Sequence, residues 1–230
     1  MWVLFDIGST LIEGPPYGPG RRLIKALGLE DGNSAAVNNL MFRTPLTDAR
    51  ELGRHLAERF GCDRETAERE AGALWRAQID EAWVVPGAAE ALHMLAEADI
   101  PWAYISNIWT PFYQGFLRHF PKEDRRPSFL SYRLGVSKPD LGIYRFALRT
   151  LGIVPQNAVM IGDTYQNDIA PAIELGIKTI WLLHRPEKES ADLQAISEGN
   201  APAPDLTLQS IEELRLEHIT ALIARSPGRI

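Results

Sequence analysis

The chain has 230 residues, and its 24 Lys and Arg against 30 Asp and Glu give a formal net charge of −6. This acidic balance argues against nucleic acid and membranes as partners, because nucleic acid and anionic membrane surfaces attract basic proteins. Hydrophobic residues make up 45% of the chain and charged residues 23%, which is ordinary for a folded protein and excludes wholesale disorder.

The first predicted element is a strand over residues 2–5, followed by a long helical stretch. Residues 13–85 contain apolar residues at helical spacing and no convincing strand, with Thr47 and Asp63 placed as helix N-caps. We therefore predict an all-α cap domain over 13–85, inserted after the first strand of an α/β core. That core domain is predicted to consist of residues 1–12 and 86–230.

The rest of the chain alternates between short apolar runs and helical patterns. Runs at 102–105, 158–161 and 178–183 suit strands that are covered on both faces. Helices are predicted from Pro86, over 139–151 and over 168–175, and a short strand at 206–208 with a helix from Ser210 follows. This alternation is typical of βαβ units and predicts a Rossmann-like α/β fold with a doubly wound parallel sheet.

Three polar residues stand at the carboxyl ends of predicted strands, where open α/β sheets bind their ligands. They are Asp6, Ser106 and Asp163, and Asp168 follows at the start of a predicted helix. Carboxylates brought together repel unless a cation lies between them, and oxygen ligands of this kind are the preference of Mg²⁺. A metal beside a positioned carboxylate suits displacement at phosphorus, with Asp6 attacking to give an aspartyl phosphate.

Four short segments occur in the order of the four motifs of the haloacid dehalogenase (HAD) superfamily. These segments are Asp6–Thr10, Ser106-Asn107, Ser137–Asp140 and Gly162–Asp168. From Met1 to about Leu183 the chain therefore resembles this superfamily, and its helical insert stands where the superfamily carries a helical C1 cap. The resemblance implies a hydrolase similar to phosphoglycolate phosphatases or haloacid dehalogenases.

The resemblance also implies roles for the acidic residues and for Gly8. Asp6 resembles the nucleophile and a metal ligand, and the backbone carbonyl of Gly8 resembles a second ligand. Asp163 resembles the third protein ligand of Mg²⁺, and Asp168 resembles its supporting partner.

Three further residues correspond to the groups that hold the phosphoryl group in the superfamily. Ser106 resembles the hydroxyl that binds this group, and the amide of Asn107 would lie close by. Lys138 resembles the fixed cation that balances the nucleophile and the phosphoryl oxygens, a task that suits a compact ammonium group.

Position 8 departs from the superfamily pattern. Many phosphatases of the superfamily carry a second Asp two residues after the nucleophile, as the acid that protonates the leaving group, and this chain has Gly8 there. General acid–base help is worth roughly 10²–10⁴-fold, so its loss matters. Three interpretations remain: a phosphatase that tolerates the loss, a metal-independent 2-haloacid dehalogenase, or a weak or inactive protein that binds phosphorylated metabolites.

The motif around Asp163 and Asp168 argues for a metal, which the dehalogenases do not use, and so favours phosphoryl chemistry. We expect a Mg²⁺-dependent phosphatase that acts on a small phosphorylated metabolite through an aspartyl phosphate. We further expect a monomer or homodimer. The single cysteine, Cys62, excludes an intrachain disulfide and indicates a reducing, cytoplasmic location.

Overall fold

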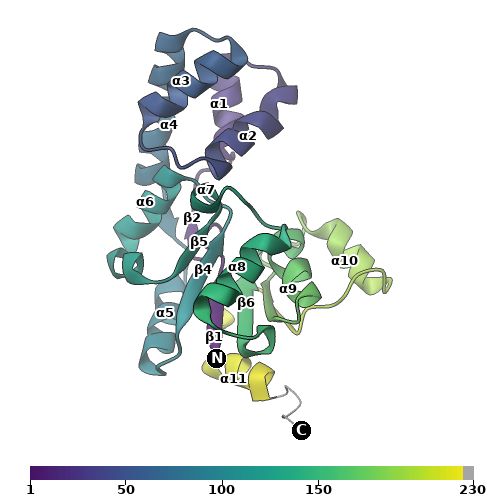
Figure 1. The fold of residues 1–230 in the computed structure, drawn as a ribbon. Helices are drawn as coiled ribbons and strands as arrows, with labels where there is room; N and C mark the ends of the chain where they lie inside the picture. The colour runs from purple at the N-terminus through teal and green to yellow at the C-terminus, as the bar shows by residue number, and fades with distance from the viewer. Residues whose placement is uncertain (225–230) are drawn as a thin grey trace.

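A parallel sheet of six strands lies at the centre of the computed structural model, which describes residues 1–224 (Figure 1). The strands are β1 (Trp2–Phe5), β4 (Trp102–Ser106), β5 (Ser128–Leu130), β6 (Ala158–Gly162), β7 (Lys178–Leu182) and β8 (Leu206–Leu208). Their order is β5-β4-β1-β6-β7-β8, and every neighbouring pair is parallel. The chain thus builds the sheet outward from β1 in both directions, which confirms the predicted doubly wound α/β fold.

The central strand β1 shows why these runs are apolar throughout. Val3 pairs with Trp102 of β4 on one side and with Val159 of β6 on the other. Along β1, Val3 and Phe5 join the apolar cluster on one face of the sheet, and Leu4 joins the cluster on the opposite face. Both faces are covered, so a polar residue inside β1 would be buried.

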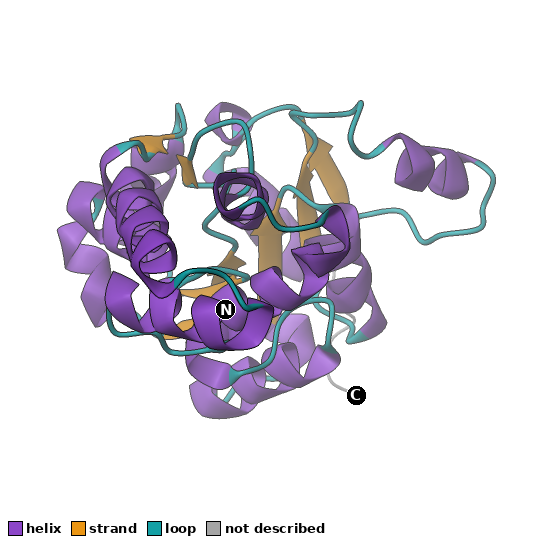
Figure 2. Cartoon of the chain, turned by 90° about the horizontal axis from the view of Figure 1, so that it is seen from above, coloured by secondary structure: helices purple, strands orange, loops and turns teal. Residues whose placement is uncertain are grey.

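Helices cover the two faces of the sheet. Their bounds are α5 (Ala88–Glu97), α6 (Thr110–His119), α7 (Ser131–Leu134), α8 (Leu141–Leu151), α9 (Ala170–Glu174), α10 (Ser190–Ser197) and α11 (Leu216–Ala224). Buried residues of α5, α6 and α11 share one apolar cluster, whereas those of α8 and α9 share the other. Helix α10 lies out beyond the sheet in both ribbon views (Figures 1 and 2).

The sequence missed β5, α6, α7 and α10, and it misplaced several helix starts; the helix predicted from Ser210, for example, begins at Leu216. The helix predicted over 139–151 begins at Leu141, because the side chain of Asp140 accepts a hydrogen bond from the Gly142 amide and caps it. The helix predicted over 168–175 opens with a π-helical turn, η4 (Tyr165–Ile169), before α9. Single 3₁₀ turns occur at η1 (Asp31–Asn33), η2 (Pro121–Arg125), η3 (Pro155–Asn157) and η5 (Ile211–Glu213).

Four helices form the upper part of the molecule in Figure 1. They are α1 (Pro19–Leu27), α2 (Ser34–Arg43), α3 (Ala49–Phe60) and α4 (Arg64–Asp80), and they bury an apolar cluster largely of their own. Helices α3 and α4 pack closely, because a Cβ atom at Gly53 would lie only 2.5 Å from the Cα atom of Glu68. The division into a core domain and a cap domain remains a prediction.

The caps of these helices follow the sequence in part. Asp63 caps α4 as predicted, by accepting a hydrogen bond from the Thr66 amide. For α3 the predicted cap, Thr47, was wrong: Asp48 occupies the N-cap and accepts from the Glu51 amide at 2.8 Å. Thr47 instead donates to the Glu51 carboxylate from its backbone and its hydroxyl, which reinforces the same first turn.

The two ends of the helical segment lie side by side. Strand β2 (Ile12–Glu13) pairs antiparallel with β3 (Trp83–Val84), with Ile12 opposite Val84 and Glu13 opposite Trp83. The expectation of no strand within 13–85 was therefore wrong at both ends, because runs of two residues carry too little periodicity to be recognised. Within residues 1–224, no helix has the length and apolar character needed to cross a membrane.

Candidate functional site

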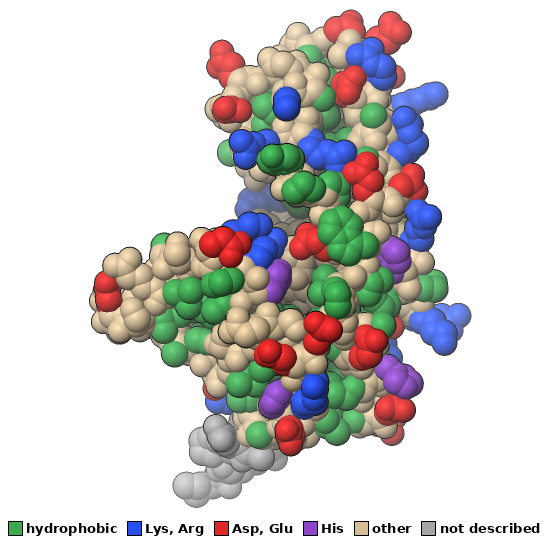
Figure 3. Space-filling model, turned by 180° about the vertical axis from the view of Figure 1, so that it is seen from behind, with side chains coloured by type: hydrophobic (Ala, Val, Ile, Leu, Met, Phe, Trp, Pro, Cys, Tyr) green, Lys and Arg blue, Asp and Glu red, His purple; other side chains and the backbone are tan. Residues whose placement is uncertain are grey.

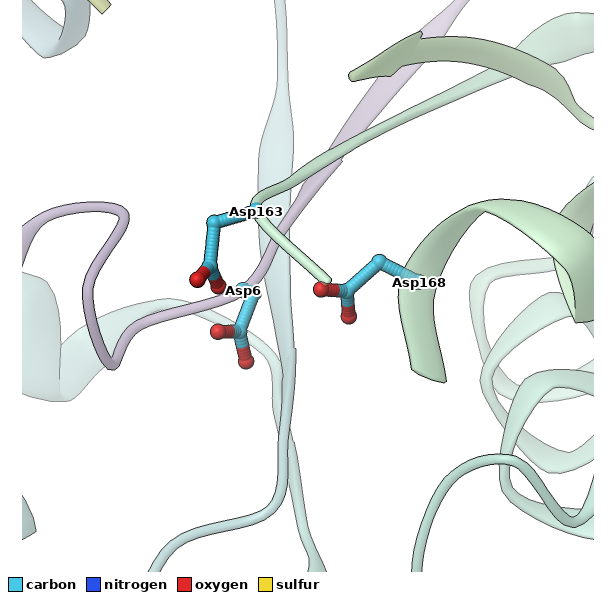
Figure 4. Close-up of side chains that lie close together, drawn as sticks. All are labelled: Asp6, Asp163 and Asp168. Atoms are coloured by element: carbon cyan, nitrogen blue, oxygen red, sulfur yellow. The ribbon is translucent and has the colours of Figure 1, made fainter. Parts of the chain in front are cut away.

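Three buried carboxylates meet at one edge of the sheet (Figure 4). Asp6 directly follows β1, Asp163 directly follows the neighbouring strand β6, and Asp168 lies in the turn η4. One carboxylate oxygen from each lies within 4.8 Å of the others. The parallel pairing of β1 and β6 brings their carboxyl ends together, which accounts for the meeting of residues so distant in sequence.

A glycine makes room for the third carboxylate. A Cβ atom at Gly162 would lie 2.4 Å from Cγ of Asp168, closer than real Cβ contacts come. Asp168 is also held by the backbone, since its Oδ2 atom accepts a hydrogen bond of 3.0 Å from the Thr164 amide. The sequence Gly-Asp at the end of β6 therefore serves the packing of Asp168 as well as the placement of Asp163.

Lys138 connects two of the carboxylates from the loop before α8. Its side chain is buried, and Nζ donates to Oδ1 of Asp6 at 2.7 Å and to Oδ1 of Asp168 at 2.5 Å. Burial opposes the charge of the ammonium group, but the carboxylates of Asp168 and Asp6 outweigh burial and raise the pKa of Lys138 above its ordinary value. Lys138 is therefore a fixed positive charge inside the site.

Asn107 holds the backbone of Lys138 in place. The Asn107 side chain donates from Nδ2 to the Lys138 carbonyl at 2.8 Å and accepts at Oδ1 from the Lys138 amide at 2.8 Å. Its amide is thus already engaged on the chain, although Asn107 also lines the cavity above the carboxylates. Ser106 ends β4 next to it and is buried, so its hydroxyl is largely closed off from solvent.

Sequence reasoning missed Arg185, which follows the apolar run of β7. Its guanidinium donates to Oδ2 of Asp163 and lies 3.8 Å from Oε2 of Glu13 on β2. A recognisable signal existed, because Arg185 is the first charged residue after a buried parallel strand next to β6. Its distance from the four recognised motifs kept it out of the predicted set.

The site carries more negative than positive charge. Burial first, and then the charges of Asp168 and Asp6, raise the pKa of Asp163 to about 8, although Arg185 acts in the opposite direction. Burial also raises the pKa of Asp168 to about 6, against the opposing effect of Lys138. The carboxylates therefore disfavour full ionisation unless a further cation joins them, and their oxygens are the donors that Mg²⁺ prefers.

Two cavities adjoin the carboxylates. A small one of about 200 Å³ is lined by Asp6, Lys138, Asp163, Asp168 and neighbouring residues. A larger one of about 520 Å³ shares Gly8, Ser9, Asn107 and Arg185 with it. The structure thus brings Asp6, Gly8, Asn107, Lys138, Asp163 and Asp168 around one site, and the roles expected for them and for Ser106 remain predictions. Seen from behind, a hollow between the upper helices and the sheet has Lys, Arg and apolar side chains at its rim (Figure 3).

Comparison with known proteins gives consistent results. A family model described as HAD-hydrolase-like matches residues 135–214. The chain is 28% identical over 210 residues to the ribulose-1,5-bisphosphate 5-phosphatase of Halopiger xanaduensis, which covers 82% of this chain and 86% of that protein. It is 32% identical over 89 residues to the phosphoserine phosphatase of Thermus thermophilus, over 38% of this chain but only 31% of that protein.

Solved structures confirm the fold along nearly the whole chain. The 2-haloacid dehalogenase of Pseudomonas syringae pv. Tomato superposes with a TM-score of 0.63 at 20% identity, over 96% of this chain and 97% of that one. At this identity the likeness concerns the fold alone. The resemblance inferred from the four motifs is thus confirmed.

Proposed function

We propose that this chain, which matches a HAD-hydrolase-like family model over residues 135–214 and shares the fold of a 2-haloacid dehalogenase, is a phosphatase of a small phosphorylated metabolite. One observation carries the proposal: buried Lys138 joins Asp6 to Asp168, with Asp163 beside them, at the carboxyl edge of the sheet. In this proposal Asp6 is the nucleophile and Lys138 the fixed cation, and the phosphoryl group would lie in the adjoining cavity of about 200 Å³. The phosphatases among its relatives support the same chemistry.

In the first step, an oxygen of Asp6 forms a bond to phosphorus while the bond from phosphorus to the leaving oxygen breaks. The leaving alkoxide takes up a proton from solvent water, and the phosphoryl group stays on Asp6 as an acyl phosphate. Lys138 holds Asp6 in position and balances charge on the phosphoryl oxygens. In the second step, water attacks phosphorus, releases inorganic phosphate and restores the Asp6 carboxylate.

The donor set fits Mg²⁺. Asp6 and Asp163 would hold the ion by carboxylate oxygens and Gly8 by its backbone carbonyl, with Asp168 in support; all four line the small cavity. When bound, the ion would neutralise phosphoryl oxygens and so favour attack by an anionic nucleophile. The raised pKa of Asp163 supports this assignment, because it reflects buried negative charge without enough compensation.

The test is phosphate release from p-nitrophenyl phosphate and acetyl phosphate in the presence of Mg²⁺. Release should stop with EDTA and in Asp6→Asn, which removes the nucleophile with little change of shape. Asp31→Asn, on the 3₁₀ turn η1, is the matched control and should retain full activity.

Two other results would replace this proposal. Chloride release from 2-chloropropionate that EDTA does not affect would identify a metal-independent dehalogenase, for which Gly8 in place of the usual second acid is an argument. Tight binding of phosphate without turnover of any substrate would identify a binding protein.

A further inference from the structure

The larger cavity beside the carboxylates has aromatic walls. It measures about 520 Å³, within the roughly 300–1,000 Å³ usual for small-molecule sites. Five aromatic side chains line it: Tyr17, Phe42, Trp83, Trp109 and Phe112. They come from segments distant in the sequence, namely the loop before α1, the end of α2, strand β3 and the segment around the start of α6. Such convergence of flat side chains suits a flat ligand better than a small, highly charged one.

Two of these aromatic residues lie open to solvent. Tyr17 is 61% exposed and Trp83 is 48% exposed, whereas Trp109 is buried. Large apolar side chains left exposed beside a cavity are typical of a surface that a ligand covers. Tyr17 and Trp83 lie on the two connections between the helical segment and the sheet, and both line the cavity.

A buried amide in the same cavity offers a hydrogen-bond donor. Gln78 of α4 is 3% exposed, and its Oε1 atom accepts a hydrogen bond of 2.9 Å from the indole nitrogen of Trp109. Because an indole N–H can only donate, this bond fixes which end of the amide is oxygen. The Nε2 atom of Gln78 makes no hydrogen bond within residues 1–224, so a ligand with an acceptor would satisfy it.

Two basic side chains lie at the boundary between the two cavities, close to where a bound phosphate would be. Arg185 lines both the small cavity and the larger one, and Lys188 lines the larger one. A phosphate at Asp6 would therefore lie on one side of Arg185, and the rest of the substrate would extend toward the aromatic walls. The ligand should therefore carry a phosphate at one end and a flat group at the other, connected by a short spacer.

We propose that the substrate is a nucleoside 5′-monophosphate, whose base lies among the aromatic side chains with a carbonyl or ring nitrogen accepting from Gln78. The inference rests on the proposed phosphatase function and specifies its leaving group. A base supplies what the cavity can bind: a flat apolar face for the aromatic side chains and a hydrogen-bond acceptor for Gln78. A sugar phosphate supplies acceptors in its hydroxyl and carbonyl oxygens but no flat apolar face.

The sharpest comparison is between UMP or AMP and ribose 5-phosphate. All three release phosphate from the same kind of primary alcohol, so they differ in the base and hardly in intrinsic reactivity. We expect kcat/KM for at least one nucleotide to exceed that for ribose 5-phosphate roughly ten- to hundredfold, as stacking of one base on aromatic side chains allows. Nucleotide binding should also quench tryptophan fluorescence, because Trp83 is exposed at the cavity.

Variants separate base recognition from folding. Trp83→Leu should lower kcat/KM for the nucleotide and leave ribose 5-phosphate unaffected, and Gln78→Met should act in the same direction. Phe146→Leu is the matched control, since Phe146 is 41% exposed on α8 and lies outside the cavity lining; it should change neither substrate.

Equal or faster hydrolysis of ribose 5-phosphate or ribulose 1,5-bisphosphate would overturn the inference while the phosphatase proposal stands. If no substrate released phosphate, the proposed function would fail instead. The inference would then be decided by calorimetry on the Asp6→Asn variant, where UMP or AMP must bind more tightly than ribose 5-phosphate.

Discussion

Gly8 and Phe112 are neighbours across the candidate site: a Cβ atom built on Gly8 would lie 3.6 Å from Cε1 of Phe112. This distance is an ordinary van der Waals contact, so position 8 has room for a side chain. Gly8 lies two residues after Asp6, where many related phosphatases carry their proton donor. The ring of Phe112 therefore borders the space that an acid would enter.

Gly8→Asp should raise the rate for substrates with poor leaving groups. The new carboxyl group would protonate the departing alkoxide of an alkyl phosphate such as glycerol phosphate. Such help typically raises the rate by roughly 10²-fold or more. Acetyl phosphate should gain little, because its leaving group needs no proton. Gly8→Asn is the control of equal size without an acid. An equal gain in both variants would refute the proton-donor explanation.

Lys138→Met should destabilise the protein strongly. Lys138 is buried between Asp6 and Asp168, and its removal leaves two carboxylates facing one another without their cation. Breaking such a buried pair costs about 3–5 kcal/mol of unfolding free energy, which urea denaturation would measure. Lys122→Met, at an exposed lysine, should be nearly neutral, and adding Asp168→Asn to Lys138→Met should recover part of the loss. Equal stability of both lysine variants would contradict the buried-pair assignment.

The stability of the protein in EDTA should fall as the pH rises toward 9. In the unfolded chain Asp163 has its ordinary pKa near 3.8, whereas burial and the nearby Asp168 and Asp6 raise its pKa in the folded protein to about 8. Between these values the folded state holds a proton that the unfolded state has lost, so stability falls steadily from about pH 4 to about pH 8 and levels off above that.

Thermal unfolding between pH 6 and pH 9 would measure this dependence, and Asp163→Asn should flatten it. Added Mg²⁺ should restore stability most at the alkaline end, where the carboxylates are ionised and free to bind it. A rise in stability with pH in EDTA would show that Asp163 is not held in its protonated form.

Arg185→Met should strengthen binding of Mg²⁺ in the absence of phosphate. The guanidinium pairs with Asp163 and so competes with a metal ion for the same carboxylate. Isothermal titration calorimetry should therefore show a lower Kd for Mg²⁺ in the variant, together with weaker binding of inorganic phosphate, which loses a cation. Lys188→Met, at the same cavity but without contact to Asp163, should leave the Kd for Mg²⁺ unchanged. Weaker binding of Mg²⁺ to Arg185→Met would instead mean that Arg185 organises the carboxylates.

The central strands were predictable because their residues face apolar layers on both sides. Strand β5 was missed because it has three residues, of which only Phe129 and Leu130 are apolar, at the edge of the sheet. Helix α6 escaped notice because its apolar residues are mostly aromatic and it contains Pro111 and Gly115. Short or irregular elements such as these depend on their neighbours more than on their own periodicity.

The acidic part of the site was predictable for a related reason. Asp6 and Asp163 each follow an apolar strand directly, and the parallel sheet brings such positions together. Phe112 and Gln78 were not predictable, because each reaches the site from a helix whose path the sequence does not reveal. Arg185 could have been found from its place after the buried strand β7. All three side chains line the larger cavity. The sequence therefore predicted the acidic residues of the site but not the residues that would contact the rest of a substrate.

Strands β2 and β3, of two residues each, hold the two ends of the helical segment together, so the length of that segment does not affect the geometry of the sheet. Glu13 and Trp83 stand opposite each other in register, so the chain leaves the sheet body and returns to it at one point. Lengthening or shortening the intervening residues 14–82 would change the closure entropy only slowly and would not shift any strand. Specificity can therefore diverge by exchange of this segment, while the carboxylates stay where the parallel strands place them.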